Sequence, residues 1–179
     1  MTAETMEIKR TVDVIIPVYK PDAVFETLLE RLGKQSYPIR RIIIMNTEQS
    51  FWKNDAYEAV PNLEVHHVKK SEFDHGGTRN KGASFSEADI MVFMTDDAVP
   101  ADRELIGELV KGLSLSGPAG EPAAVAYARQ LPNSDCALAE KYTRSFNYPD
   151  QSRIKTKGDL KELGIKTFCA SNVCCAYDR

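Results

Sequence analysis

The sequence predicts an α/β fold in which a mostly parallel sheet carries helices on both faces. Between residues 12 and 128, short runs rich in Val and Ile alternate with stretches whose apolar residues recur at helical spacing. Several of the runs are apolar throughout, which is typical of strands buried on both faces. Strands that alternate with helices form parallel sheets, because each helix returns the chain to the edge where the next strand begins.

The first half of the chain contributes strands and one helix to this prediction. The helix begins at Pro21 or Asp22 and ends near Gly33. Its expected apolar face consists of Val24, Phe25, Leu28, Leu29 and Leu32. The expected strands are Val12–Tyr19 and Arg41–Asn46, both buried, and the alternating, half-exposed Leu63–Val68.

In the middle of the chain we expect a loop over residues 71–77, followed by two helices and two strands. The helices are Thr78–Glu87 and Asp102–Leu115, and the strands are Ile90–Met94 and Ala123–Ala128. The last third changes character. Its expected elements are a helix over Asn133–Arg144, an irregular Phe146–Lys157, a short helix over Asp159–Leu163 and a strand-like Thr167–Tyr177.

Composition limits the classes of protein to which the chain can belong. The 179 residues are 42% hydrophobic, enough for one domain with a core, and the net charge of −3 provides no basic face for nucleic acid. The first ten residues are polar, and no stretch approaches the ~20 apolar residues of a membrane helix. We therefore expect a cytoplasmic protein without a signal peptide or transmembrane segment. The four cysteines have no His at ligand spacing and are expected to be buried, reduced thiols.

Two adjacent carboxylates, Asp96 and Asp97, directly follow the most hydrophobic predicted strand. Ligands of open α/β sheets bind outside the carboxyl ends of the strands. Adjacent carboxylates repel each other unless a cation or strong donors lie beside them, and hard oxygen ligands suit Mg²⁺ or Mn²⁺. A helix N-cap or a turn is the alternative, because Asp is common in both and Pro100 follows. On this dipeptide alone, both interpretations stay open.

A glycine-containing segment is the second candidate site. Gly76 and Gly77 would let the backbone approach a ligand, and a helix beginning near Thr78 would point its free N–H groups toward it. Arg79 and Lys81 in the first turn oppose the helix dipole, an arrangement that an anion such as a diphosphate would offset. A glycine turn with solvated charges is the alternative. The segment is not a dinucleotide-binding or P-loop motif.

Weaker candidates lie near these two segments. Glu48 follows the second predicted strand and could bond a ribose or a base, while His75 is the histidine beside the glycines. Phe51 and Trp52 could stack on a base or sugar, although aromatic side chains more often fill a core. For Glu48 the alternative is an ordinary surface carboxylate.

Taken together, the ordered motifs resemble glycosyltransferase family 2. Its pattern contains a strand ending in P-x-Y, a second strand ending in an acidic residue, a G-x-R-N-x-G segment and a strand ending in D-x-D. The corresponding segments here are IIPVYKP (Ile15–Pro21), GGTRNKGA (Gly76–Ala83) and Thr95-Asp96-Asp97. The rhamnosyltransferase branch is the most similar, on FDHGGTRN, the T-x-D variant, and the segments 129–132, 146–149 and 168–172.

This resemblance implies a GT-A fold and an inverting, metal-dependent transfer from a nucleotide sugar, dTDP-L-rhamnose. The acceptor would be a saccharide or lipid-linked saccharide in cell-surface polysaccharide synthesis, with peripheral association at the inner face of the membrane. Asp97 would hold the divalent cation, Mg²⁺ or Mn²⁺, and Ser171 and Asn172 would border the acceptor. The donor nucleotide would be contacted by Pro17, Val18, Tyr19, Glu48, Arg79, Asn80 and Asp96.

The resemblance also divides the chain. Residues 1–131 would form the donor-binding region, and 132–179 the start of an incomplete acceptor lobe of the same domain. The family's general base, an Asp or Glu, is expected beyond Arg179, so no catalytic residue is assigned. Asn46 stands where the family usually has Asp. Two other classes are alternatives: a catalytically silent nucleotide-binding module of the same fold, and a nucleotidyltransferase. The latter is disfavoured, because the residues after the first strand are not a glycine- and basic-rich loop.

Overall fold

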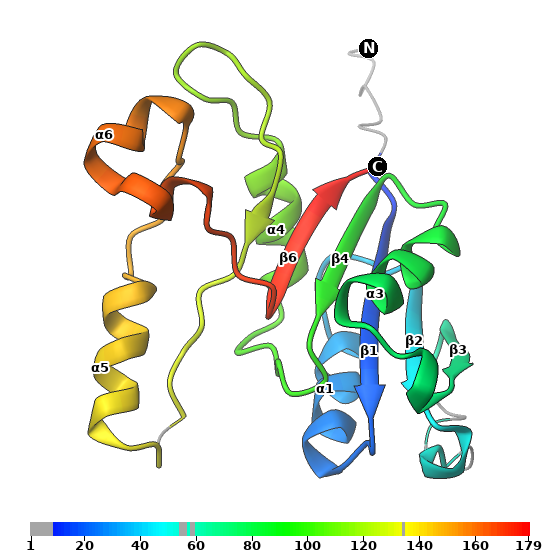
Figure 1. Cartoon of the computed structure of the whole chain (residues 1–179). Coiled ribbons are helices and arrows are strands. Elements are labelled where there is room, and N and C mark those ends of the chain that lie inside the picture. Colours follow the sequence, from blue (N-terminus) through cyan, green and yellow to red (C-terminus); the bar gives the residue numbers. More distant parts are fainter. Residues whose placement is uncertain (1–8, 54–56, 58–59, 134) are drawn as a thin grey trace, which may run out of the picture.

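A computed structural model describes residues 9–53, 57, 60–133 and 135–179 of the chain (Figure 1). The prediction that the chain has no signal peptide rests largely on residues 1–8, which lie outside these ranges. In the part that the structure describes, no helix has the length and apolar character needed to span a membrane.

A six-stranded sheet with strand order β3-β2-β1-β4-β6-β5 organises the protein. Four strands run parallel: β1 (Val12–Tyr19), β2 (Arg41–Thr47), β3 (Leu63–Val68) and β4 (Ile90–Met94). The other two, β5 (Ala126–Tyr127) and β6 (Cys174–Asp178), are antiparallel to each other, and β6 is antiparallel to β4. The chain runs outward from β1 to β3 and then returns to β4 on the other side of β1. The carboxyl ends of β1 and β4 therefore form the topological switch point.

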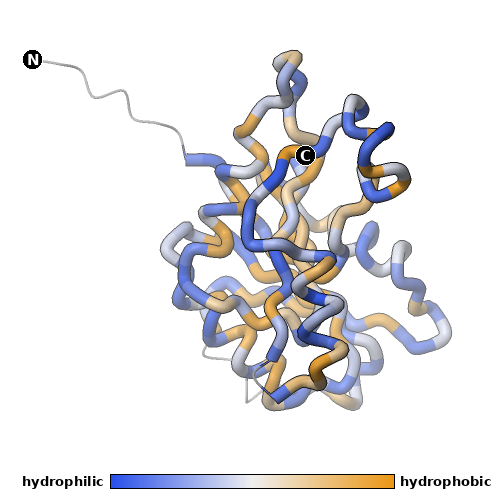
Figure 2. Tube along the Cα trace, turned by 90° about the vertical axis from the view of Figure 1, so that its left-hand side faces the viewer, coloured by the Kyte–Doolittle hydropathy of each residue, from blue (hydrophilic) through white to orange (hydrophobic). Residues whose placement is uncertain are grey.

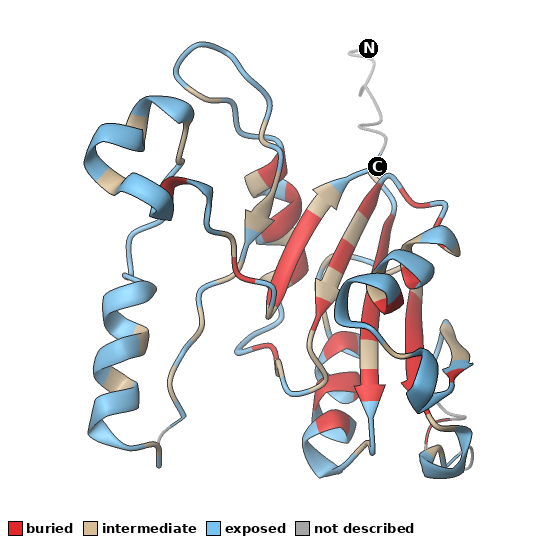
Figure 3. Cartoon of the chain, in the orientation of Figure 1, coloured by how far each residue is buried: buried red, intermediate tan, exposed pale blue. Residues whose placement is uncertain are grey.

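Helices cover both faces of the sheet, as the sequence predicts. On one face, α1 (Ala23–Gly33) and α4 (Leu105–Leu113) pack on the larger core cluster, to which β1 contributes Val14 and Ile16. On the other face, α3 (His75–Ser84) packs on β1 and β2 beside a smaller cluster that contains Ile15. Figure 3 shows the buried residues concentrated in the central strands and in α1 and α4. Because successive side chains of β1 point to opposite faces of the sheet, this strand contributes residues to both cores.

The close packing of α3 on the sheet depends on Gly82. A Cβ atom at this position would lie 2.6 Å from Cγ2 of Ile15 and 3.1 Å from Cγ of Met45. Because real Cβ atoms do not approach other atoms so closely, only glycine allows this helix to lie where it does.

The start of α1 confirms the predicted helix and corrects one residue of its face. The Asp22 carboxylate accepts the N–H groups of Val24 (2.9 Å) and Phe25 (3.2 Å), which is the expected N-cap. The predicted apolar face is otherwise buried, but Val24 is 44% exposed. It lies about 100° around the helix from Phe25, at the border with solvent.

Several predicted boundaries were wrong. α3 begins and ends three residues before the predicted helix, α4 begins at Leu105 rather than Asp102, and β5 is only two residues long. The Asp102 carboxylate accepts the N–H of Glu104, which holds residues 102–104 in a turn ahead of α4. Two segments of the last third also differ: α5 is Leu138–Asn147, and the strand-like 167–177 divides into the end of η4 (Gly164–Phe168) and β6.

Residues 135–172 lie beside the β5 edge of the sheet (Figure 1), and most of them are exposed. Neither α5 nor α6 (Leu160–Leu163) contains a buried residue. Figure 2 shows hydrophobic residues gathered along the strands at the centre of the molecule. Of the four cysteines, all of them free, Cys174 and Cys175 in β6 are buried as predicted. Cys136 is only half-buried and Cys169 is exposed, because both lie in this open region.

Candidate functional site

The candidate site lies at the carboxyl ends of β1 and β4, at the switch point of the sheet. Tyr19, the last residue of β1, donates its main-chain N–H to the carboxylate of Asp96 across 3.3 Å. β1 and β4 pair in parallel, so both strands end at this edge. The first and last motifs of the sequence pattern are therefore joined by a direct hydrogen bond.

The two adjacent carboxylates have different environments. Burial raises the pKa of Asp96; the Tyr19 N–H opposes this shift, and the charges of Asp97 and Asp22 add to it. Asp97 is exposed, and one of its oxygens accepts the Thr95 hydroxyl at 2.6 Å. The segment is also a turn, since Ala98 donates its N–H to the Thr95 carbonyl. The edge thus concentrates negative charge that a cation would offset.

These carboxylates fit a divalent cation that also binds phosphate. Among the described residues, no three His, Cys, Asp or Glu side chains gather into a metal-binding group. Mg²⁺ is commonly held by one or two carboxylates together with substrate phosphates and waters, so this sparse set suits it. Asp97 is the exposed carboxylate of the pair and would be the ligand, while the pKa of Asp96 is raised mainly by burial, with the charge of Asp97 adding to the shift.

At the end of β2, a buried amide leaves one acceptor unused. Nδ2 of Asn46 donates to the carbonyl of Glu48 (3.1 Å) and lies 2.9 Å from Nδ1 of His67. Because this nitrogen can only donate, Nδ1 of His67 must be the acceptor. Oδ1 of Asn46 is buried and has no partner within the described ranges. A ligand N–H at this edge would satisfy it.

Glu48 ties the ends of β2 and β3 together. Its backbone adopts φ 66°, a conformation that is uncommon for residues other than glycine. Its carboxylate accepts the main-chain N–H of Lys70, at the start of the short helix η2 (Lys70–Glu72). The residue predicted to contact the base therefore also holds a turn.

Aromatic rings and ammonium groups lie beside the carboxylates. The rings of Tyr19 and Phe51 meet edge to face at 5.5 Å, and both residues are partly exposed. The ammonium groups of Lys20 and Lys70 lie 5.2 Å and 5.6 Å from the centre of the Tyr19 ring. These two lysines were not predicted from the sequence, although Lys20 directly follows β1 and Lys70 follows β3 by two residues. Together the four side chains form a cationic, aromatic surface suited to a base and its phosphates.

α3 begins before the position predicted for it, next to the glycine-containing segment. The carboxylate of Asp74 accepts the N–H of Gly77 at 2.6 Å, and its carbonyl accepts the N–H of Thr78 at 2.8 Å. The helix begins at His75, so the glycines lie in its first turn and Arg79 lies beyond it. The Asp74 carboxylate thus caps the first turn of the helix, ahead of the position predicted for its start.

Arg79 and Asn80, the two residues of α3 predicted to contact the donor nucleotide, differ in exposure. Arg79 is half-buried, and its Nε has no partner among the described residues. Burial raises the pKa of both Cys175 and Tyr177, and the charge of Arg79 opposes both shifts, so Arg79 lies close to β6. Asn80 is exposed.

The remaining predicted site residues flank this edge. Pro17 is half-buried, whereas the side chain of Val18 is 2% exposed and belongs to the core, so only its backbone reaches the edge. On the other side, Thr95 donates its N–H to the carbonyl of Val173 at 3.0 Å. Ser171 and Asn172, the predicted acceptor-side residues, directly precede Val173. Ser171 is buried and Asn172 is exposed.

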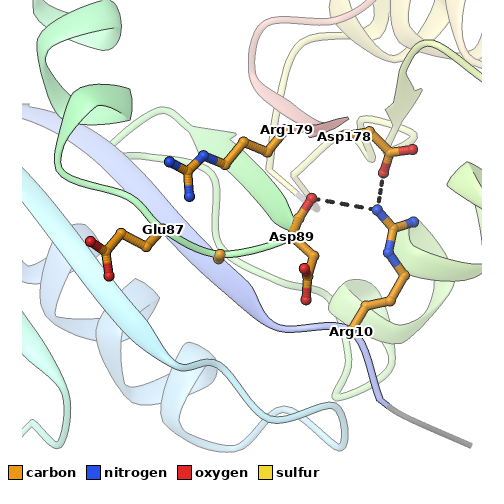
Figure 4. A pocket seen from close by; sticks show the side chains of 6 residues that line it. Arg10, Glu87, Asp89, Asp178 and Arg179 are labelled. Carbon is orange, nitrogen blue, oxygen red and sulfur yellow. Dashed lines mark hydrogen bonds and ion pairs between the residues drawn. The ribbon is translucent and has the colours of Figure 1, made fainter.

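A large cavity lies at the opposite ends of the strands (Figure 4). Its volume is about 590 Å³, and it is lined by Arg10, Glu87, Ala88, Asp89, Asp178 and Arg179. Arg10 pairs with Asp178 and donates to the carbonyl of Asp89, whose carboxylate accepts from Thr11. We assign no function to this cavity, because Arg10 and Asp178 pair with each other and sheets of this kind bind ligands at the other edge.

Comparison with known proteins gives a consistent result. The family model described as "Glycosyl transferase family 2" matches residues 13–179. The O-antigen chain rhamnosyltransferase RfbN of Salmonella typhimurium is 33% identical over 177 residues, which cover 94% of this chain and 52% of the relative. WbaN of Salmonella anatum, which has the same description, is 37% identical over 169 residues, covering 93% and 51%. The chain therefore spans about half the length of these curated relatives.

A solved structure shares the fold. The mannosyltransferase PcManGT from Pyrobaculum calidifontis, in complex with GDP-Man and Mn²⁺, superposes with a TM-score of 0.61 at 16% identity. The superposition covers 97% of this chain and 46% of that one. The GT-A architecture and the resemblance to the rhamnosyltransferase branch are thus confirmed.

Proposed function

Because the chain belongs to glycosyl transferase family 2, we propose that it binds a nucleotide sugar and serves the transfer of its sugar to an acceptor hydroxyl. The observation that supports this most directly is the Tyr19–Asp96 hydrogen bond beside the exposed Asp97, at the switch point of the sheet. A ligand at this point lies between the loops that follow β1 and β4.

The proposed donor is dTDP-L-rhamnose. Two relatives that match over nearly the whole chain are named O-antigen chain rhamnosyltransferases, which supports this choice. The rings of Tyr19 and Phe51 offer a stacking surface for the base. The unused acceptor of Asn46 and the carboxylate of Glu48 are polar groups that would contact the base or the ribose. Pro17 and Val18 would contact the nucleotide through their main-chain atoms.

In this proposal, Asp97 holds a divalent cation, Mg²⁺ or Mn²⁺, and Asp96 adds its charge beside it. When bound, the cation offsets the charge that develops on the leaving diphosphate. Arg79 and Asn80 donate hydrogen bonds to the nucleotide or its diphosphate. The acceptor oxygen bonds to the anomeric carbon as the bond to the diphosphate breaks and the hydroxyl proton passes to a base, so the configuration inverts. No described residue is assigned as that base.

The remaining expectations belong to the same proposal. Residues 1–131 would bind the donor, and 132–179, with Ser171 and Asn172, would begin the acceptor side. The acceptor would be a saccharide or lipid-linked saccharide of a cell-surface polysaccharide, reached from the cytoplasm at the inner face of the membrane. The descriptions of the two O-antigen relatives support this placement.

A thermal-shift panel of nucleotide sugars, with and without Mn²⁺, tests the proposal. A ligand at a hundredfold excess over its Kd stabilises the folded chain by about 2.7 kcal/mol. We expect dTDP-L-rhamnose with Mn²⁺ to raise the Tm more than UDP-sugars do. If no nucleotide sugar raises the Tm with metal, donor binding is disproved; if UDP-sugars rank first, only the rhamnosyl assignment fails.

A further inference from the structure

The orientation of α5 differs from that of an ordinary surface helix. Its apolar residues Leu138, Tyr142 and Phe146 are 84%, 73% and 62% exposed. Its polar residues Glu140, Thr143, Arg144 and Asn147 recur at i, i+3, i+4 and i+7, and so form the opposite stripe. This polar stripe, rather than the apolar one, lines a cavity against the rest of the chain.

The cavity has a volume of about 310 Å³. Its lining consists of the four polar residues of α5 together with Gln130 and Tyr148. A volume near the lower end of the range for ligand sites, roughly 300–1,000 Å³, suits one small ring rather than an extended ligand.

A hydrogen-bonded network fixes one wall of this cavity. Nε2 of Gln130 donates to the Tyr148 hydroxyl (2.6 Å) and to the Ser171 hydroxyl (2.8 Å), while its Oε1 accepts from Arg144 (2.5 Å). The donors and the acceptor of the Gln130 amide are all used, so its orientation is defined. Arg144 also bonds Glu140 at 2.9 Å, which makes the pair neutral overall. The network joins α5 to the segment that carries Ser171.

The same network approaches the switch-point edge. Ser171 lies two residues before Val173, whose carbonyl accepts the N–H of Thr95. Thr95 in turn donates its hydroxyl to Asp97. Because two residues span at most about 7 Å, the cavity wall and the carboxylate turn are close neighbours.

We propose that this cavity binds a single pyranose ring of the acceptor saccharide, a step that rests on the function proposed above. The paired Glu140 and Arg144 leave no net charge to attract an anion, and an apolar ligand would leave the carboxamide of Asn147 without a hydrogen-bond partner. Hydroxyl groups of a neutral sugar can both donate to and accept from these side chains. The carboxamide of Asn147 makes no hydrogen bond within the described residues, so it remains to meet such a ligand.

Titration of the ¹⁵N-labelled chain with neutral methyl glycosides tests this site. The probes are methyl α-L-rhamnopyranoside, methyl α-D-mannopyranoside and methyl α-D-galactopyranoside, each raised to high millimolar concentration, with glycerol as a non-sugar control. We expect at least one glycoside, and not glycerol, to shift the side-chain amide signals of Gln130 and Asn147 with a common midpoint. If no glycoside shifts these signals, or if glycerol shifts them equally, the proposal is overturned.

Matched variants on α5 locate the binding. Asn147→Ala should weaken glycoside binding about tenfold, the loss expected for one or two hydrogen bonds. Ser145→Ala, an exposed position outside the lining, should leave it unchanged. Thr143→Val provides a second lining variant if Asn147→Ala proves unstable. Equal effects at positions 145 and 147 would contradict the proposal.

The nucleotide response separates this inference from the proposed function. None of the three α5 variants should alter the Mn²⁺-dependent rise in Tm with dTDP-L-rhamnose. If the wild-type chain shows a nucleotide response but no glycoside shifts, the saccharide site alone is overturned. Glycoside shifts without any nucleotide response would support a sugar site and contradict the donor-binding function.

Discussion

The main-chain N–H of Tyr19, at the end of β1, donates a hydrogen bond of 3.3 Å to the carboxylate of Asp96, which follows β4. This contact joins two strands that are far apart in sequence but adjacent in the sheet. It holds Asp96 half-buried and leaves Asp97 to face solvent. The two carboxylates therefore differ in exposure, and we expect a substitution of each to have a different effect.

Asp97→Asn should remove the metal dependence of nucleotide binding. The amide is nearly the same size as the carboxylate but carries no charge, so it is a poor ligand for Mg²⁺ or Mn²⁺. We expect the affinity for dTDP-L-rhamnose with Mn²⁺ to fall at least tenfold, to the value measured without metal, by calorimetry. Asp102→Asn, in the turn before α4, provides a control with the same loss of charge. Unchanged, metal-dependent affinity in Asp97→Asn would exclude Asp97 as a metal ligand.

Asn46→Asp should destabilise the folded chain. Nδ2 of Asn46 donates to two acceptors, the Glu48 carbonyl and Nδ1 of His67, and a carboxylate cannot donate to either. The expected loss is about 1–3 kcal/mol in the free energy of unfolding, measured by urea titration at pH 8. The exposed Asn172→Asp carries the same change of charge and should cost less than about 0.5 kcal/mol. Equal stability of the two variants would show that the Asn46 hydrogen bonds contribute nothing.

The first four strands could be predicted from the sequence because their patterns are local. Apolar runs such as Ile90–Met94 admit few other structures, and Asp22 caps α1 where its position predicts. The antiparallel pairing of β5 with β6 joins distant segments, so no local pattern marks either strand's ends. The true start of α3 was missed because Gly76 and Gly77 are poor helix formers, yet the Asp74 cap and packing on the sheet override that preference.

The candidate site was predictable to a similar degree. The rule that ligands bind at the carboxyl ends of strands brought the motifs of β1 and β4 to one edge before any contact was known. The bond from the Lys70 N–H to Glu48 was not predictable, because it depends on an unusual backbone conformation at Glu48. The polar face of α5 was also missed, since a helical pattern alone does not say which stripe faces inward.

Gly82→Ala and Gly33→Ala should have opposite effects on stability. The new Cβ at position 82 would lie 2.6 Å from Ile15, so α3 would have to shift from the sheet, at a cost of about 1–3 kcal/mol. At Gly33, the last residue of α1, nothing lies within 4 Å, and alanine favours helix by up to about 1 kcal/mol. Thermal unfolding should therefore show a lower Tm for the first variant and an equal or higher Tm for the second. A Tm equal to wild type in Gly82→Ala would mean that α3 does not pack as closely as described.

Asp13→Asn should make the free energy of unfolding depend less on pH in the acid range. Asp13 is fully buried in β1, and burial alone would raise its pKa above the ordinary 3.8. Hydrogen bonds from Arg40 and Ser86, with the charges of Arg40 and Arg41, outweigh burial and hold the pKa lower. Folding therefore favours the ionised carboxylate. Its stabilisation is complete above the unfolded pKa and is lost as pH falls through the lowered native value.

At pH 7 we expect Asp13→Asn to cost about 2 kcal/mol, the scale of a hydrogen bond to a charged group. The deficit relative to wild type should persist down to about pH 5 and shrink below about pH 4, where the Asp13 carboxylate of the unfolded wild-type chain begins to bind protons. Urea unfolding at a series of pH values measures both curves. Glu30→Gln, at an exposed pair with Lys34, is the control and should change stability little at any pH. A deficit that stayed constant to about pH 2 would show that the packing of the substituted amide, and not the lost charge, causes it.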